Sequence, residues 1–180
     1  MTYPAAPSRS RPLLETLTQV NNAGTNVRKS ILDATAEEFA TITRVNQEST
    51  WHLCKLAHAL LVRSPRPTVV NVASAAGVQS TGSGSVYAMT KAAVEQLTKS
   101  LACEWAKYGI RVNCVAPWVT LTPLLAEAIR DDPSSLEKAS SWTPMGRPGN
   151  PEEVRARPPS STLLFSDLQV TSRSAPASSP

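Results

Sequence analysis

The feature that most restricts the fold of this chain is the alternation of short β-branched segments with long amphipathic ones. Residues 68–73 read TVVNVA, a short apolar run typical of a strand buried in a parallel sheet. Apolar residues recur at helical spacing before it, over 35–60, and after it, over 86–107. Shorter strand-like runs lie at 17–20 and 110–115. Because alternating strands and helices build parallel sheets with right-handed crossovers, the sequence predicts an α/β fold.

The ends of these segments carry start and stop signals. Thr35 can cap the first helix, and Glu38 follows three residues later, as in a capping box. Gly109 stands just after the second helix, where a glycine commonly ends one, and Pro117 interrupts the last strand-like run. Beyond that proline we expect only short helices, at 124–130 and 135–140 and from Asn150 onward.

Composition divides the chain into one folding unit and two tails. Of the 180 residues, 41% are hydrophobic, which is enough for one domain with a sizeable core. Both ends are rich in serine, proline and arginine. We therefore expect a disordered lead at 1–14, one domain at 15–155 and a disordered tail at 156–180.

Composition also makes several function classes unexpected. The net charge of +4 is spread without a basic stripe, so we expect no nucleic-acid partner. No apolar run has the length of a membrane span and no hydrophobic secretory segment opens the chain, so we expect a cytoplasmic protein with no membrane partner. Cys54, Cys103 and Cys114 are far apart, which indicates neither a disulfide framework nor a zinc site. We expect His52 and His58 not to be ligands, so no metal site is predicted.

The stretch SVYAMTK, residues 85–91, places a tyrosine and a lysine four residues apart at the start of the second long helix. Residues at this spacing share one helix face, so the polar ends of Tyr87 and Lys91 would lie side by side. A free phenol has a pKa of about 10, and a neighbouring ammonium group would lower it by favouring the phenolate. The pair is a candidate proton-transfer device, and the plainer alternative is a solvent-facing helix surface.

Other polar residues fall where this device could use them. Ser74 ends the TVVNVAS segment, Asn46 lies on the preceding helix, and NNAG, residues 21–24, follows the preceding strand. Each side chain has a structural alternative, because Ser74 could satisfy the amides of the next loop and Asn46 could bond to its own helix. In this order, on alternating strands and helices, NNAG, Asn46, Ser74 and YxxxK together resemble the short-chain dehydrogenase/reductase family.

The resemblance covers about Val20 to Val154 and is strongest to the plant tropinone-reductase-like group. The stretches NNAGTNVRKS, TAEEF, LACEWAKYGIRVN, VAPW and GRPGNPEEV carry it. Trp118 stands where many relatives in the wider family have glycine, and the tropinone-reductase-like group often has tryptophan there. The resemblance implies a Rossmann-like doubly wound parallel sheet, and hydride transfer between NADP(H) and a ketone or secondary alcohol.

The resemblance also implies a role for each candidate residue. Tyr87 would protonate the carbonyl oxygen, and Lys91 would lower the pKa of Tyr87 and bind the nicotinamide ribose. Ser74 would orient the carbonyl group, and Asn46 would hold a water in a proton relay. Besides Tyr87 and Lys91, the residues implied in cofactor binding are Asn22, Ala23 and Gly24 on the adenosine side, and Val119 and Thr122 at the carboxamide and phosphates. Thr122 could equally be a turn residue.

The chain departs from the family pattern at both ends. No strand, glycine-rich turn and helix precede NNAG, although the family holds the dinucleotide pyrophosphate with those elements. After GRPGNPEEV, the family's final apolar helix and paired glycines are missing as well. We therefore expect a partial sheet with the counterparts of strands 4 to 6 and their flanking helices, and residues 124–142 as a lid over the substrate.

Two functions stay open. The first is an oxidoreductase of the tropinone-reductase-like type that uses NADP(H), impaired as this truncated chain because the cofactor cradle is missing. The second is a non-catalytic module that binds an intact relative through its long helices. The expected partners are a small-molecule ketone or alcohol, together with a second copy of the chain or an intact relative.

Overall fold

The computed structural model describes residues 17–154, so the predicted tails, 1–14 and 156–180, lie outside the described residues. Within this range the strands are β1 (Thr18–Asn21), β2 (Thr68–Val72) and β3 (Arg111–Val115). The long helical elements are α1 (Ala36–Thr43), a π-helical turn (Arg44–Glu48), α2 (Ser49–Leu61) and α3 (Ser85–Trp105). Short 3-10 turns span Ala75–Gly77 and Ala106–Tyr108, and α4 (Pro123–Asp131), α5 (Ser134–Ser141) and α6 (Pro151–Val154) follow β3.

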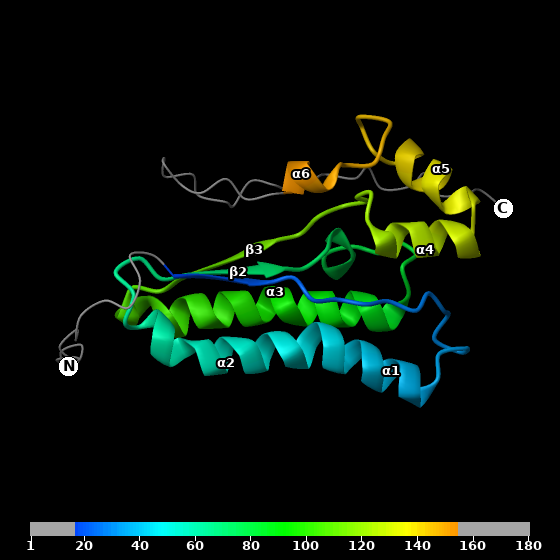
Figure 1. Cartoon of the computed structure of the whole chain (residues 1–180). Coiled ribbons are helices and arrows are strands. Elements are labelled where there is room, and N and C mark those ends of the chain that lie inside the picture. Colours follow the sequence, from blue (N-terminus) through cyan, green and yellow to red (C-terminus); the bar gives the residue numbers. More distant parts are fainter. Residues whose placement is uncertain (1–16, 155–180) are drawn as a thin grey trace.

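The three strands form one parallel sheet in the order β1–β2–β3. The α1–α2 unit connects β1 to β2, and α3 connects β2 to β3, so each strand is followed by a helical crossover to its neighbour. Both crossovers lie on the same face of the sheet (Figure 1). The predicted α/β fold with a partial parallel sheet is thereby confirmed.

The predicted uninterrupted helix over 35–60 is wrong in its middle. Thr35 caps α1 with the expected box, because its hydroxyl accepts from Glu38 N and the Glu38 carboxylate accepts from Thr35 N. A π-helical turn then separates α1 from α2. Ser49 Oγ donates to Val45 O at 2.6 Å, and Thr50 Oγ1 donates to Asn46 O at 3.0 Å. Such hydroxyl bonds to carbonyls four residues back compete with regular helical geometry. In a π turn the backbone hydrogen bonds join residues five apart, so side chains there face other directions than in an α-helix.

The core lies between the sheet and the α2–α3 pair. Its buried hydrophobic members include Leu61 on α2, Val69 on β2 and Trp105 at the end of α3. Two buried asparagines cross this core and are fully paired: Asn21 Nδ2 donates to Asn71 Oδ1 at 2.7 Å, and Asn71 Nδ2 donates to Thr98 Oγ1 at 2.9 Å. Buried amides cost stability unless bonded, so this chain of bonds fixes β1, β2 and α3 relative to one another.

β1 is the edge strand of the described sheet. It begins and ends one residue later than the predicted run at 17–20, since Thr18 pairs with Thr68 and Asn21 with Asn71. Val20 is 58% exposed, although valine is a residue that strands usually bury. Among the described residues, only β2 pairs with β1.

An ion pair fixes the segment that leads into α6, and it gives a testable titration. Arg147 donates from Nη1 and Nη2 to the Glu153 carboxylate, both at 2.9 Å, and Asn150 N donates to it at 2.7 Å. The hydrogen bonds from Arg147 come first in lowering the pKa of Glu153 from 4.5 to about 2.

We expect Glu153 to stay ionised as the pH falls below 4 and to titrate near 2 in a carboxylate NMR experiment. A lowered carboxyl pKa stabilises the folded state above its unfolded value of 4.5, and that contribution is lost as the pH falls through about 2. Arg147→Met should return the titration toward 4.5. A titration midpoint that does not move in this variant would contradict the ion pair.

Candidate active site

The candidate residues meet at the carboxyl edge of the sheet. Because β1 and β2 are parallel and Asn21 pairs with Asn71, the segments that follow the two strands leave the sheet side by side. Asn22, Ala23 and Gly24 are exposed directly after β1, and Ser74 follows β2. In open α/β sheets, ligands bind in the crevice at this edge.

Tyr87 lies in the first turn of α3 and faces Ser74. The two hydroxyls share a hydrogen bond, and Ser74 Oγ also accepts from Ala76 N at 3.2 Å. Ser74 therefore caps the following turn, as its structural alternative required, and contacts Tyr87 as well. Burial raises the pKa of Tyr87 above its usual value of 10, while the bond to Ser74 and the charge of Arg28 act in the opposite direction.

Lys91 is 4% exposed and lies one turn after Tyr87. Its Nζ donates to Val72 O at 2.9 Å and lies 5.7 Å from the centroid of the Tyr87 ring. Burial lowers the pKa of Lys91, and the charge of a nearby Cys114 thiolate would raise it. The two polar groups thus share one helix face, as the four-residue spacing predicts.

The expected effect of Lys91 on Tyr87 is not observed in this structure. The groups that lower the pKa of Tyr87 are Ser74 and Arg28, and the net direction is upward because burial dominates. The Lys91 ammonium group is directed to the Val72 carbonyl. Tyr87 is therefore a protonated phenol at neutral pH in this structure.

Asn46 lies in the π-helical turn and is almost completely buried. Its side chain does not bond to its own helix, which excludes the structural alternative. Instead Oδ1 accepts from Thr25 N at 2.8 Å, and Nδ2 donates to Thr25 O at 3.0 Å and to Thr90 Oγ1 at 3.1 Å. Asn46 thereby holds the loop after β1 against α3.

Gly24 brings this loop close to the polar groups. A Cβ atom on Gly24 would lie 3.4 Å from Lys91 Nζ and 3.6 Å from Asn46 Oδ1. Gly77, after Ser74, is even more restricted, since a Cβ there would lie 2.8 Å from Ala92 N on α3. The loop that follows β2 therefore approaches α3 at a distance that requires glycine, whereas a Cβ atom at Gly24 would make ordinary contacts with Lys91 and Asn46.

The remaining predicted cofactor residues lie after β3. Thr122 Oγ1 accepts from Leu125 N at 3.4 Å and caps α4, so the turn role considered for it is present. Val119 O accepts from Gly149 N at 2.9 Å. Trp118 Nε1 donates to Thr143 Oγ1 at 2.8 Å and so joins the end of β3 to the segment after α5. Contact of Val119 and Thr122 with a cofactor stays a prediction.

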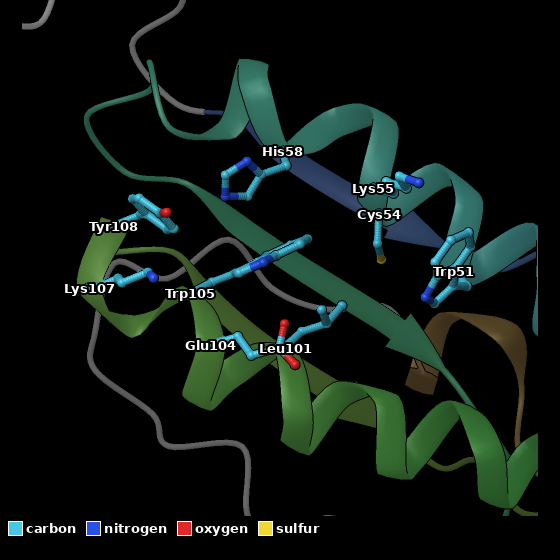
Figure 2. Close-up of a pocket in the computed structure, with 9 residues that line it drawn as sticks. All are labelled: Trp51, Cys54, Lys55, His58, Leu101, Glu104, Trp105, Lys107 and Tyr108. Atoms are coloured by element: carbon cyan, nitrogen blue, oxygen red, sulfur yellow. The ribbon is translucent and has the colours of Figure 1, made fainter. Parts of the chain in front are cut away.

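A cavity of about 460 Å³ lies away from this cluster. It opens between α2 and the carboxyl end of α3, where His58 lies against Trp105 and Tyr108 (Figure 2). Trp105 is eighteen residues from Tyr87, or about 27 Å along the helix at 1.5 Å per residue. Asn46, Ser74, Tyr87 and Lys91 do not line this cavity.

Within 17–154, no three His, Cys, Asp or Glu side chains gather where they could hold a metal ion. No helix in the same range is both long enough and apolar enough to cross a membrane.

Comparison with known proteins identifies the family. The profile described as Enoyl-(Acyl carrier protein) reductase matches residues 17–169, most of the chain. A solved oxidoreductase of the short-chain dehydrogenase/reductase family from Burkholderia thailandensis superposes with a TM-score of 0.69 at 26% identity, over 78% of this chain and 54% of that one. The chain belongs to the short-chain dehydrogenase/reductase family.

Within this family the chain is tropinone-reductase-like. It is 47% identical over 153 residues to a tropinone reductase homolog of Arabidopsis thaliana, covering 85% of this chain and 56% of the relative. A tropinone reductase homolog of Datura stramonium is 44% identical over 137 residues, covering 75% of this chain and 51% of the relative. The chain thus spans about half the length of these relatives. The profile match also extends past Val154, where the predicted resemblance ended.

A solved relative shows the cofactor class that this fold can hold. A gluconate 5-dehydrogenase from Burkholderia cenocepacia, solved in complex with NADP and tartrate, superposes with a TM-score of 0.71 at 28% identity. The superposition covers 76% of this chain and 53% of that one. A nicotinamide cofactor is thus present in a solved protein whose fold resembles that of this chain.

Thr25 and Arg28 belong to the site although the sequence analysis assigns them no role. Thr25, in the loop after β1, holds both ends of the Asn46 amide through its backbone, which no side-chain pattern could indicate. Arg28 lies close enough to Tyr87 for its charge to lower the tyrosine pKa. Both residues lie in the stretch NNAGTNVRKS, which carries the family resemblance but does not by itself indicate what Thr25 and Arg28 contact.

The bond between Ser74 and Tyr87 makes a testable difference to the tyrosine titration. Ser74→Ala removes a group that lowers the pKa of Tyr87, so we expect the pKa to rise further above 10. The measurement is absorbance of the phenolate against pH, with the signal of Tyr87→Phe subtracted. A Tyr87 titration that is unchanged, or shifted downward, would show that the Ser74 hydroxyl does not face the phenol.

Proposed function

We propose that this protein is an oxidoreductase that reduces a ketone to a secondary alcohol with NADPH, and that Tyr87, Ser74 and Lys91 carry the reaction. The observation that supports it most is the convergence of the Tyr87 and Ser74 hydroxyls with the Lys91 ammonium at the carboxyl edge of the sheet. Two parts of the fold supply these groups: the segment after β2 supplies Ser74, and the first two turns of α3 supply Tyr87 and Lys91.

The protonation state of Tyr87 favours the reducing direction. Reduction of a carbonyl places negative charge on its oxygen, and a neutral phenol within reach can donate the proton that this oxygen needs. Burial keeps Tyr87 in that neutral form at neutral pH. Ser74 would donate a second hydrogen bond to the same oxygen and fix its position before transfer. The substrate class that we propose is a small-molecule ketone, with the corresponding alcohol as product.

The loop after β1 and the Lys91 amine fit a nicotinamide nucleotide. Gly24 leaves an open approach beside Lys91 Nζ that a side chain would narrow, and Asn22 and Ala23 are exposed next to it. Lys91 would donate to the ribose hydroxyls, and residues 22–24 would line the adenosine side. A bound nicotinamide supplies the hydride; the residues of this chain orient the carbonyl and deliver the proton. Val119 and Thr122 would complete the cofactor contacts.

The sequence has no glycine-rich turn before NNAG to cradle a pyrophosphate. We propose that this chain alone consequently binds NADPH weakly and turns over slowly. A cytoplasmic location stays a prediction, and the name of one Arabidopsis thaliana relative places that protein in the chloroplast.

Calorimetric titration of the purified chain with NADPH tests the cofactor assignment. We expect saturable binding with a Kd of about 1 mM, weaker by about tenfold in Lys91→Met through loss of a charge-assisted hydrogen bond. Lys107→Met is the matched control, because Lys107 lies in the 3-10 turn after α3, beside Tyr108 and far from Lys91. Absence of saturable heat from a folded chain would reject this function, as would equal weakening by both variants.

A non-catalytic interaction module is the second candidate, and one observation favours it. α2 exposes Leu53, Leu56 and Leu60 to solvent. Exposed apolar side chains on one element are typical of a surface that another protein covers. Sedimentation velocity on the chain alone and with an intact relative tests this function. Association without any NADPH heat would favour the module over the enzyme.

A further inference from the structure

Thr90, inside the stretch SVYAMTK, lies at the centre of the site without a role in the reaction proposed above. It is 2% exposed. Its Oγ1 donates to Tyr87 O at 2.8 Å and accepts from Asn46 Nδ2 at 3.1 Å. A hydroxyl has a single proton, so donation to the Tyr87 carbonyl leaves only its lone pairs to face Asn46. Thr90 Oγ1 can therefore accept a hydrogen bond from Asn46 Nδ2, but it has no proton left to donate to Asn46 Oδ1.

Both hydrogens of the Asn46 amide, and one acceptor position of its oxygen, are used in these contacts. Nδ2 donates one hydrogen to Thr25 O at 3.0 Å and the other to Thr90 Oγ1, and Oδ1 accepts from Thr25 N at 2.8 Å. Thr25 belongs to the loop after β1, and Thr90 to α3. One buried side chain thus joins the cofactor-facing loop to the helix that carries Tyr87 and Lys91.

We propose that Thr90 is a positioning residue. Its hydroxyl fixes the orientation of the Asn46 amide and thereby holds the loop at Gly24 in place beside Lys91. We call this Thr90–Asn46 hydrogen bond, with its effect on the loop, the lock. Its importance for turnover rests on the proposed function, whereas the lock itself is a property of the unliganded chain. Without the Thr90 hydroxyl, one Nδ2 hydrogen of Asn46 would be buried without a partner, and the loop would lose one of its attachments to α3.

The chain contains a matched control for this residue. Thr98, also on α3, is 5% exposed; its Oγ1 donates to Val94 O at 2.8 Å and accepts from Asn71 Nδ2 at 2.9 Å. Thr98 therefore makes the same two kinds of bond as Thr90, but to a core asparagine of β2. Replacing either threonine with valine removes one buried hydroxyl from the same helix, and only Thr90→Val removes it from the site.

The first test measures the hydrogen bonding of the Asn46 side chain in the unliganded chain. In nitrogen-15 spectra, Thr90→Val should shift the Asn46 side-chain amide signals and speed their hydrogen exchange by about tenfold, the effect of one lost buried bond. Thr90→Ser should retain the wild-type signals. Thr98→Val should change the Asn71 signals and leave those of Asn46 unchanged. If Thr90→Val does not fold, Thr90→Ala takes its place.

The second test measures kcat/KM with NADPH and a ketone. We expect kcat/KM to fall about tenfold in Thr90→Val, to recover in Thr90→Ser, and to stay near wild type in Thr98→Val. Unchanged Asn46 signals in Thr90→Val would overturn the lock whether or not the chain is active. Equal losses of kcat/KM in Thr90→Val and Thr98→Val would overturn the positioning role. Wild-type chain that transfers no hydride, with the Asn46 signals changed as expected, would reject the proposed function and support the lock.

Discussion

Tyr87→Phe is expected to lower kcat/KM for ketone reduction by about 10²- to 10⁴-fold, the range that a positioned general acid supplies. The substitution removes only the phenol oxygen, the atom that would deliver the proton to the carbonyl. Since the half-buried ring is retained, we expect the unfolding midpoint in urea to stay close to wild type. The measurement is NADPH oxidation at saturating and subsaturating ketone.

Tyr108→Phe is the control for this substitution. Tyr108 lies at the far end of α3 against His58, with no contact to Ser74 or Lys91. Tyr108→Phe should therefore leave kcat/KM unchanged within about twofold, because it removes no group of the site. A Tyr87→Phe variant that retains more than a tenth of wild-type kcat/KM would contradict the role of Tyr87 as the acid.

Leu61→Ala is expected to destabilise the fold by about 2–5 kcal/mol, the usual cost of a cavity left by a buried leucine. Leu61 is 0% exposed at the end of α2, and it packs in the core formed with Val69, Leu101, Trp105 and Ile110. Loss of its side chain leaves unfilled space between α2 and the start of β2. The measurement is the midpoint of urea unfolding by circular dichroism, at an unchanged slope.

Leu56→Ala, on the same helix, separates burial from helix propensity. Leu56 is 74% exposed, so its removal should change stability by no more than about 0.5 kcal/mol. Both substitutions replace leucine with alanine in α2. Equal destabilisation by the two variants would show that Leu61 does not lie in the core described above.

The architecture could be predicted because local signals and the global fold agree. Thr35 and Glu38 form the predicted capping box, TVVNV forms the buried central strand, and Gly109 ends the helical segment in a left-handed conformation. Each of these features depends on residues close together in the chain. The order of the polar residues then placed Ser74, Tyr87 and Lys91 at one sheet edge, because parallel strands end on the same side.

The parts that could not be predicted depend on contacts between distant segments. The π-helical turn around Asn46 has no strong signature in a run of residues that all tolerate a helix. Thr90 is not distinguished by the sequence, because its burial and its bond to Asn46 depend on the packing of α3 against the π-helical turn. The upward shift of the Tyr87 pKa reflects burial by segments far away in the chain, and the spacing of Tyr87 and Lys91 alone led to the opposite expectation.

Transfer of deuterium from NADPH labelled at C4 of the nicotinamide tests the central claim most directly. The purified chain is incubated with each of the two C4 epimers of labelled NADPH and a cyclic ketone such as tropinone, and the alcohol is analysed by mass spectrometry. We expect one deuterium at the carbinol carbon with one of the two epimers, and none above background in Tyr87→Phe. Unlabelled alcohol with both epimers, or equal labelling by wild type and Tyr87→Phe, would contradict a reductase that works through Tyr87.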